Sequence, residues 1–190
     1  MKKVINTIKG FTVLELIVSL AIFAMMTALV LSKYGNFNQG ILLTNLAYDV
    51  ALTIRNAQSY GLNVKSTTRS GSDFNKPYGV YFDTNSTLQA NTKIIFYADY
   101  NSSSTYDAGD AIIQTTTITR GSTVSRVCVN ACVSPDPTKL DIVFKRPDPN
   151  AYIRVGGSST NSSSARITLK AIDNTTKVVV VNSTGQVSVE

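Results

Sequence analysis

The chain has 190 residues and a formal net charge of +6, from 18 Lys and Arg against 12 Asp and Glu. With 43% apolar residues it is too hydrophobic for a disordered protein, and without histidine it lacks the usual general base near neutral pH and the commonest metal ligand. Lys2, Lys3 and Lys9 all precede an apolar run. Removing these three leaves 15 basic against 12 acidic residues, a net charge of +3 that is too small to indicate nucleic-acid binding.

The first predicted element is an apolar helix, because Glu15 is the only charged residue from Phe11 to Leu31. Such a helix spans about 31 Å, close to the hydrocarbon core of a bilayer, about 30 Å. Basic residues before it favour a cytoplasmic N-terminus and an exported C-terminal bulk. A signal peptide or a plain anchor would explain an apolar run, but LSKYGNF offers no persuasive small-x-small cleavage site. Neither explains a carboxylate in hydrocarbon, which costs roughly 2.5–3.5 kcal/mol.

The order of features around this helix is distinctive. A basic leader ends in Gly10, Phe11 follows, and an acid stands fifth after the glycine, within TVLELIVSLAIFAMM. This order resembles the class III signal of type IV pilins and pseudopilins. The resemblance implies that a membrane aspartic peptidase cuts after Gly10 and methylates the new N-terminus at Phe11. It also implies that Glu15 pairs with the Phe11 amine of a neighbouring subunit, since opposite charges attract strongly in low dielectric.

A second helical stretch follows the apolar run. Apolar residues recur at three- and four-residue steps, which predicts one buried stripe: Leu43, Leu46, Ala47, Val50, Ile54 and Ala57. We expect the helix to be melted or bent near Gly35–Gly40 and to end at about residue 60, with Gly61 as its C-cap.

Beyond Lys65 the pattern changes to period two with β-branched residues. Strands are predicted at 78–83, 93–98, 111–118, 123–129, 140–145, 151–155, 165–172, 176–182 and 186–189. Turn-rich segments such as NSSSTYDAGD and RPDPN separate them. One long helix followed by short antiparallel strands predicts an α+β fold, with the helix packed on an antiparallel sheet or a β-sandwich.

The predicted chain has four parts. These are a cytoplasmic leader peptide (1–10), a transmembrane or filament-core helix (11–34), an amphipathic helix half (35–62) and an exported β-rich head domain (63–190). Two stretches, ILLTNLAYDVALTIRNAQSYGLNVK and VVVVNSTGQVSV, are similar to the helix end and the final hairpin of GspH/FimT-type minor pseudopilins.

Cys128 and Cys132 lie in CVNAC, on the predicted exported side. Two thiols in an oxidising compartment favour a structural disulfide, which would contribute about 2 kcal/mol for so small a loop. Half a zinc site is the alternative, but no second Cys or His pair exists to complete four ligands.

The segment DYNSSSTYDAGD has oxygen-bearing residues at the ligand steps of an EF-hand loop. The predicted calcium ligands are Asp99, Asn101, Ser103, the Thr105 carbonyl, Asp107 and Asp110. Ser104 stands where such loops have glycine, and the last ligand is Asp, whose shorter arm hinders bidentate binding. A solvated polar hairpin loop is the alternative, so calcium is an expectation and no cofactor is required.

Basic residues gather late in the chain: Lys145, Arg146, Arg154, Arg166 and Lys170. Arg166, Thr168 and Lys170 share one face of an alternating strand, so a basic patch is feasible. DNA-binding members of the resembled family carry a terminal Gly-Arg-x-Arg stretch, whereas Gly185 is here followed by Gln186, Val187 and Ser188. DNA is therefore not the favoured partner, and a solvated face is the better interpretation.

No catalytic constellation is visible, since histidine-based dyads, a Gly-x-Ser-x-Gly elbow and a phosphate-binding Gly loop are all missing. The resemblance implies a non-enzymatic pilin-like subunit in a bacterial inner membrane and then in a surface or periplasmic filament. Its partners would be other pilin subunits, the prepilin peptidase and the inner-membrane assembly machinery. The alternatives are a tip-located minor pilin that binds DNA or surfaces, and a plain membrane-anchored β-domain.

Overall fold

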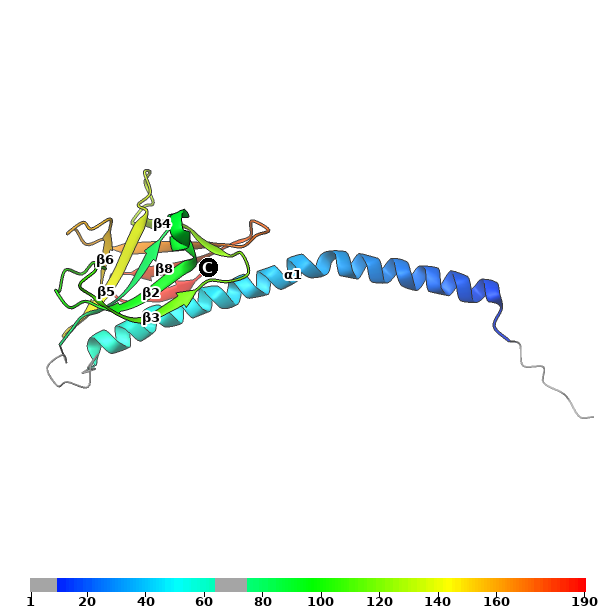
Figure 1. The fold of residues 1–190 in the computed structure, drawn as a ribbon, viewed down its shortest axis with the longest axis horizontal. Coiled ribbons are helices and arrows are strands. Elements are labelled where there is room, and N and C mark those ends of the chain that lie inside the picture. The colour runs from blue at the N-terminus through cyan, green and yellow to red at the C-terminus, as the bar shows by residue number, and fades with distance from the viewer. Residues whose placement is uncertain (1–9, 64–74) are drawn as a thin grey trace, which may run out of the picture. The chain divides into compact units, whose positions relative to one another are not determined.

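The computed structural model describes residues 10–63 and 75–190, so the predicted leader before Gly10 and the turn-rich residues 64–74 lie outside the described residues. The chain divides into two compact units, one ending at Asn38 and one spanning Gln39–Glu190. The described residues form one long helix, nine strands and a short 3-10 helix (Figure 1). This arrangement confirms the predicted α+β fold.

The helix α1 spans Val13–Leu62. Its first part, up to Asn38, belongs to the first unit. Among the described residues, Val13–Ser32 is the one segment long and apolar enough to cross a membrane, and none of it is buried inside the protein. The helix continues through residues 33–40, so the expected melting near Gly35–Gly40 is wrong: the neighbouring residues keep the helical hydrogen bonds despite two glycines.

The second part of α1 belongs to the second unit and carries the predicted apolar stripe. Leu43, Ala47, Val50, Ile54 and Ala57 are fully buried, and Leu46 packs partly buried beside them. The stripe is buried because residues three and four positions apart lie on the same face of a helix.

Gly61 has a different role from the predicted one. It is still helical, and α1 ends one residue later at Leu62. A Cβ atom at Gly61 would lie 2.5 Å from the Phe144 carbonyl oxygen. The glycine therefore allows α1 to approach a strand closely, and its prediction as the C-cap was wrong.

The first sheet has five antiparallel strands in the order β3-β2-β1-β5-β6. In chain order these strands are β1 (Tyr78–Asp83), β2 (Lys93–Ala98), β3 (Ala111–Thr117), β5 (Lys139–Lys145) and β6 (Asp148–Val155). β1 is central, with Val80 opposite Phe96 of β2 and Ile142 of β5. These three side chains are buried, so this face of the sheet is directed toward the core.

The second sheet has four antiparallel strands in the order β4-β7-β8-β9. They are β4 (Thr123–Val129), β7 (Ser164–Lys170), β8 (Thr176–Asn182) and β9 (Val187–Val189). Along β7, Ala165, Ile167 and Leu169 are buried while Arg166 is exposed, as the alternating sequence requires. The predicted final hairpin is the β8–β9 pair, whose turn holds Gly185 at φ +82°.

Buried side chains from α1 and from both sheets form one core cluster. Ile54 of α1, Phe82 of β1 and Ile167 of β7 are each fully buried members of it. The Arg55 guanidinium also donates a 3.1 Å hydrogen bond from α1 to the Val187 carbonyl of β9. The helix is therefore packed on a β-sandwich, as predicted.

Element boundaries differ from the prediction in a few places. RPDPN was predicted as a turn, yet β6 begins at Asp148 inside it, because Asp148 pairs with Lys145 beyond a bulge. The strand predicted to reach residue 172 ends at Lys170, since Asn174 N–H closes a turn onto the Ala171 carbonyl. The 3-10 helix Thr87–Thr92 was not predicted.

We predict that Gly61→Ala destabilises the second unit by about 1–3 kcal/mol, because the new Cβ would overlap the Phe144 backbone. Gly40→Ala is the matched control within the same helix. Apart from its chain neighbours and the backbone of its own helix, no described atom lies within 4 Å of its Cβ position, so it should stabilise by roughly 0.5–1 kcal/mol. Urea unfolding of the detergent-solubilised chain measures both, and equal midpoints for the two variants would contradict this account of Gly61.

Candidate assembly, disulfide and loop sites

The predicted cleavage point lies directly before α1. Gly10, Phe11 and Thr12 are not helical, and beyond its chain neighbours no described residue has an atom within 4 Å of a Cβ position at Gly10. The Gly10–Phe11 peptide bond is therefore in exposed, irregular backbone, which is the form of chain that a peptidase can bind.

Glu15 stands in the first turn of α1, where negative charge is favourable beside the positive end of the helix dipole. The Thr12 hydroxyl accepts a 3.2 Å hydrogen bond from the Glu15 N–H and so caps the helix. The capping role of Thr12 was not predicted from the sequence, although Thr-x-x-Glu before an apolar run is a capping signal. The Glu15 side chain itself is exposed.

The first unit presents a continuous apolar surface. Its large apolar side chains from Phe11 to Leu31 are 49–75% exposed. Burying one such side chain fully is worth roughly 1.5–3 kcal/mol, so this segment gains much from lipid or from other helices. Gly10, Phe11 and Glu15 therefore lie at the start of an exposed apolar surface. Lipid or another apolar helix would stabilise this surface by covering it.

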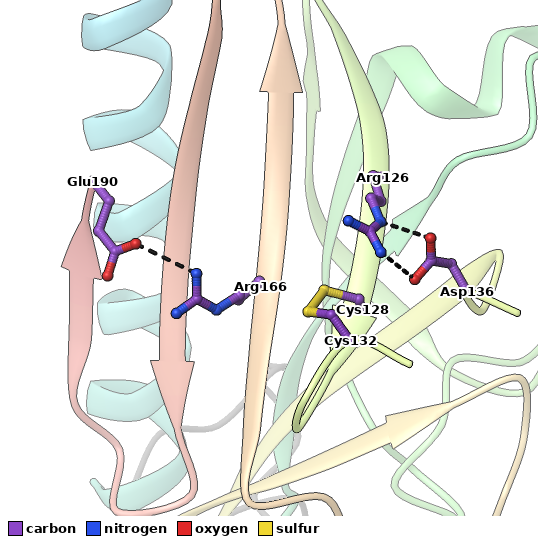
Figure 2. Close-up of a disulfide and its surroundings, with 6 residues drawn as sticks. All are labelled: Arg126, Cys128, Cys132, Asp136, Arg166 and Glu190. Atoms are coloured by element: carbon purple, nitrogen blue, oxygen red, sulfur yellow. Dashed lines mark hydrogen bonds and ion pairs between the residues drawn. A yellow bond between two sulfur atoms is a disulfide. The ribbon is translucent and has the colours of Figure 1, made fainter. Parts of the chain in front are cut away.

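The disulfide is confirmed: Cys128 and Cys132 are bonded, with their Cα atoms 5.0 Å apart. Figure 2 shows that Cys128 lies on β4 beside β7, and that Cys132 returns from the following loop. Asn130 N–H donates to the Ser164 carbonyl, and its side chain accepts from Ser163, so the small loop is tied to the start of β7.

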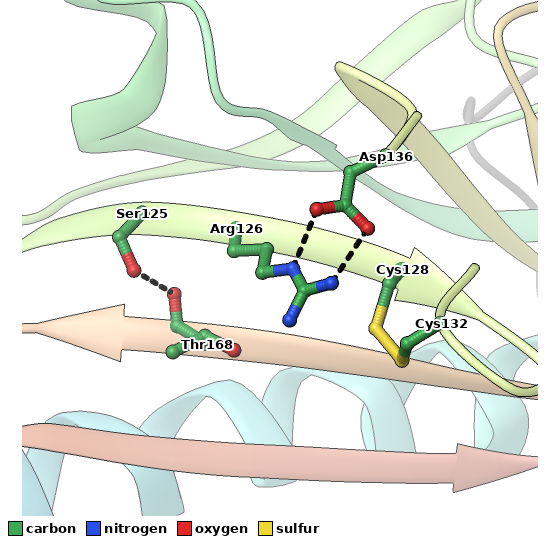
Figure 3. A network of polar contacts seen from close by, with 6 residues as sticks. All are labelled: Ser125, Arg126, Cys128, Cys132, Asp136 and Thr168. Carbon is green, nitrogen blue, oxygen red and sulfur yellow. Dashed lines mark hydrogen bonds and ion pairs between the residues drawn. A yellow bond between two sulfur atoms is a disulfide. The ribbon is translucent and has the colours of Figure 1, made fainter. Parts of the chain in front are cut away.

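The disulfide borders an open groove of about 370 Å³ on the second sheet. Arg126 and Arg166 also line it, and each is paired with an acid. Arg126 makes a bidentate pair with Asp136, at 2.6 and 2.9 Å, next to the Ser125–Thr168 hydrogen bond (Figure 3). The guanidinium lowers the pKa of Asp136 below its usual range.

The predicted basic residues lie on two sheets. Lys145, Arg146 and Arg154 are on or beside β5 and β6, whereas Arg166 and Lys170 are on β7. Arg166 is 3.5 Å from a Glu190 carboxylate oxygen. Arg146 donates to Asn75, and Arg154 donates to the Ser103 carbonyl. Three of the five therefore have partners within the chain, so the structure does not join them into one free basic patch.

The predicted calcium segment forms a loop between β2 and β3 whose polar groups bond one another. The fully buried Asp99 accepts from the backbone N–H groups of Ser103 and Ser104, at 3.1 and 2.8 Å. Asp110 accepts from Tyr100 and Asp107 N–H, and burial raises the pKa of Asp110.

The fit of a calcium ion to this loop is partial. Ser102 and Ser104 adopt positive φ, the conformation for which such loops use glycine. However, Asn101 donates a 2.6 Å hydrogen bond to Asp107, and that bond lowers the pKa of Asp107. Across the described residues, no three acidic, His or Cys side chains are placed to hold one metal ion. Calcium binding therefore stays a prediction.

Asp141 on β5 holds this loop on the outer face of the first sheet. Its carboxylate accepts from Tyr97 Oη at 3.0 Å and from the Tyr106 backbone N–H at 2.9 Å. The Tyr106 ring packs 5.1 Å from both the Tyr81 and Tyr97 rings. The role of Asp141 was not predicted from the sequence, although a lone acid inside LDIVF was a usable signal.

Burial raises the pKa values of Asp141 and Tyr97 in this cluster. Asp141 is 3% exposed, and its desolvation raises its pKa to about 6. The hydrogen bonds from Tyr106 and Tyr97 act in the opposite direction and lower it in part. Asp110 and Asp99 add negative charge nearby, in the same direction. Burial and Asp141 together raise the pKa of Tyr97 well above its usual range.

An exposed apolar helix before a disulfide-bonded α+β unit is compatible with a protein anchored in a membrane by its N-terminus. Residues 5–31 match the family described as the prokaryotic N-terminal methylation motif. The chain thus carries the prepilin-type N-terminal signature of the type IV pilin superfamily. Comparison with curated proteins and with solved structures gave no match.

We predict that saturating Ca²⁺ raises the melting temperature of the EGTA-treated chain. Calcium at a hundred times its dissociation constant adds about 2.7 kcal/mol, which corresponds to roughly 5–10 °C. Asp107→Ala should abolish the shift, whereas Asp173→Ala, in an exposed turn with a similar acceptor role, should keep it. No shift, or equal shifts in both variants, would leave the polar hairpin loop as the correct interpretation.

We predict a pH dependence that originates at Asp141. Its pKa is higher in the folded chain, about 6 against 3.8, so its stabilisation is complete below about pH 4 and is lost as pH rises through 6. The full change is about 3 kcal/mol. Asp141→Asn keeps an oxygen acceptor and should remove this fall in unfolding free energy, while Asp173→Asn should not. An unchanged pH profile in the Asp141→Asn variant would contradict the assignment.

Proposed function

We propose that the chain is a structural subunit of a pilus or pseudopilus, processed after Gly10 and assembled through α1. One observation carries this proposal: exposed irregular backbone at Gly10–Phe11 leads directly into an exposed apolar helix with Glu15 in its first turn. The match of residues 5–31 to the methylation motif supports it. A plain anchor would require the apolar run but neither the glycine nor the acid.

Processing changes the charge at the start of the helix. Hydrolysis adds water across the Gly10–Phe11 amide and leaves a carboxylate on the leader and an ammonium group on Phe11. A methyl group from a methyl-donating cosubstrate then replaces one proton of that amine. The positive amine now stands beside the positive end of the α1 dipole, where it is unfavourable without a nearby anion.

Glu15 is the anion that compensates this charge during assembly. As one subunit leaves the bilayer, its Glu15 carboxylate pairs with the Phe11 ammonium of a neighbouring subunit. Removing one partner of such a pair in low dielectric costs about 3–5 kcal/mol. The exposed apolar side chains of the first unit then bury one another, and the β-rich head domain (63–190) faces outward.

Within the pilin-like proteins, we propose that this chain is one of the GspH/FimT-type minor pseudopilins. Two features support it: the second unit combines the end of α1 with two antiparallel sheets, and strands β8 and β9 form a hairpin around Gly185. In this proposal the partners are the prepilin peptidase, other pilin subunits and the inner-membrane assembly machinery. The leader (1–10), filament-core helix (11–34), amphipathic half (35–62) and head (63–190) are its functional divisions.

We predict that Glu15→Ala leaves cleavage intact and lowers the amount of chain in sheared filaments at least tenfold. Loss of the Glu15–Phe11 ion pair costs about 3–5 kcal/mol, which is more than a tenfold change in the assembly equilibrium requires. The substitution keeps the helix cap, because the bond to Thr12 uses the Glu15 backbone N–H. Ser19→Ala is the matched control, since this exposed hydroxyl bonds only its own helix, at the Leu16 carbonyl, among the described contacts.

Quantitative mass spectrometry of the filament and membrane fractions, with the N-terminal peptide sequenced, provides the readout. The expected peptide begins at N-methylated Phe11 in both variants. An intact Met1 chain found only in membranes would overturn the proposal, as would wild-type filament levels of Glu15→Ala.

A further inference from the structure

The Cys128–Cys132 disulfide lies in an open groove on the second sheet. Both cysteines line this groove, together with Arg126 and Arg166. Its volume is about 370 Å³, enough for a small organic molecule. Cys128 is 3% exposed, whereas Cys132 is partly exposed. A molecule in the groove therefore reaches the sulfur of Cys132 more readily than the sulfur of Cys128.

Two guanidinium groups flank Cys128. Arg166 is its partner in the β4–β7 ladder, and directly opposite residues of an antiparallel pair have Cβ atoms about 4.5–5.5 Å apart. Arg126 stands two residues earlier in β4, on the same face of the strand. Figure 2 shows the disulfide between these two side chains. A negative charge on the Cys128 sulfur would therefore lie beside two cations.

The acids that pair with these two arginines, Asp136 and Glu190, are not among the residues that line the groove. Arg126 donates to Asp136 through Nε and Nη2, so its Nη1 has no acceptor among the described contacts (Figure 3). The contact between Arg166 and Glu190 is loose, at 3.5 Å, and both side chains are about half exposed. Both guanidinium groups therefore keep N–H donors for an anion in the groove.

The small loop closed by the disulfide is also held by hydrogen bonds. Asn130 N–H donates to the Ser164 carbonyl at 2.9 Å, and Asn130 Oδ1 accepts from the N–H and the hydroxyl of Ser163, at 2.8 and 3.0 Å. Cys132 N–H donates to the Val129 carbonyl at 3.0 Å. On the chain-entropy model, so short a loop adds only about 2 kcal/mol to the stability. Cleavage of the disulfide should therefore leave the second unit folded.

We propose that this disulfide is a thiol-exchange site for a small anionic thiol, which carries a carboxylate or sulfonate group in addition to its sulfur. The negative group is attracted to Arg126 and Arg166, whose guanidinium groups offer paired N–H donors. The thiolate of the same molecule attacks Cys132 and displaces Cys128. This exchange does not depend on the proposed function.

The exchange consists of two displacements. First, the incoming thiolate forms a bond to Cys132 Sγ while the native S–S bond breaks, and Cys128 Sγ leaves with the bonding electron pair as a thiolate. A second molecule of the thiol then displaces Cys132 from the mixed disulfide. Both cysteines take up protons from water, so the protein disulfide is reduced and the two small thiols are oxidised to their own disulfide.

The surroundings of Cys128 favour it as the leaving group. Burial alone makes a thiolate costly, whereas adjacent guanidinium groups stabilise it. A better stabilised thiolate leaves faster in thiol–disulfide exchange. The accessibility of Cys132 and the positive charge beside Cys128 thus favour the same direction of cleavage.

Reduction kinetics of the detergent-solubilised full-length chain test this inference. At equal thiolate concentration, anionic mercaptoethanesulfonate should reduce the disulfide roughly fivefold faster than cationic cysteamine, because opposite charges attract in the groove. Alkylation during the reaction should trap the thiol adduct on Cys132 and the alkyl group on Cys128, as read by peptide mass spectrometry. Equal rates for the two thiols, or adducts mainly on Cys128, would overturn the inference.

Charge substitutions provide the second arm. Arg166→Gln should lower the ratio of the two rates roughly threefold, whereas Arg166→Lys keeps the charge and should retain the ratio. Lys170→Gln is the matched control, since Lys170 is a cation on the same face of β7 that does not line the groove. Resistance to trypsin before and after reduction reports that each variant is folded. An unchanged ratio in folded Arg166→Gln, or an equal fall in Lys170→Gln, would contradict the site.

Discussion

The apolar surface of α1 must be buried, and the head domain covers only part of it. From Leu43 to Ala57 the helix buries a stripe of side chains against both sheets, and this contact organises the second unit. Within the first unit as described, the large apolar side chains from Phe11 to Leu31 are exposed. The second part of α1 is thus the scaffold of the head, and its first part is an exposed apolar surface. The prepilin-type motif lies in this exposed part. A helix of this kind is stable in lipid or among other helices.

In the head domain one buried acid, Asp141, holds the polar loop between β2 and β3. Asp141 receives hydrogen bonds from Tyr97 and from the backbone of Tyr106, and burial of its charge costs free energy that these bonds only partly offset. The loop between β2 and β3 is therefore held in place by Asp141 and by Arg154 from the adjacent strand, as well as by its own turns. Within the loop, Asp99 accepts a hydrogen bond from the Ser103 N–H and Asp107 accepts one from the Asn101 side chain.

Much of the fold and of the candidate site follows from local sequence patterns. The strands β1, β2, β4 and β8 have the predicted boundaries because each is a run of β-branched or aromatic residues between turn residues. Gly61 was misassigned because its role depends on Phe144, a residue distant in sequence that approaches it. RPDPN was misassigned because Asp148 pairs with Lys145 beyond a bulge. Thr12 and Asp141 did carry local signals, but only the hydrogen bonds identify their roles.

The sequence by itself determined the methylation motif and the apolar helix with its single acid, and it favoured the α+β class and a disulfide between the two cysteines. These properties depend on residue identity and on short-range periodicity, which the chain carries regardless of its packing. Only the tertiary structure decided that the basic residues divide between two sheets and that Asp141 anchors the loop between β2 and β3. Each of these depends on which strands become neighbours, and strand order is set by long-range packing that no local pattern encodes.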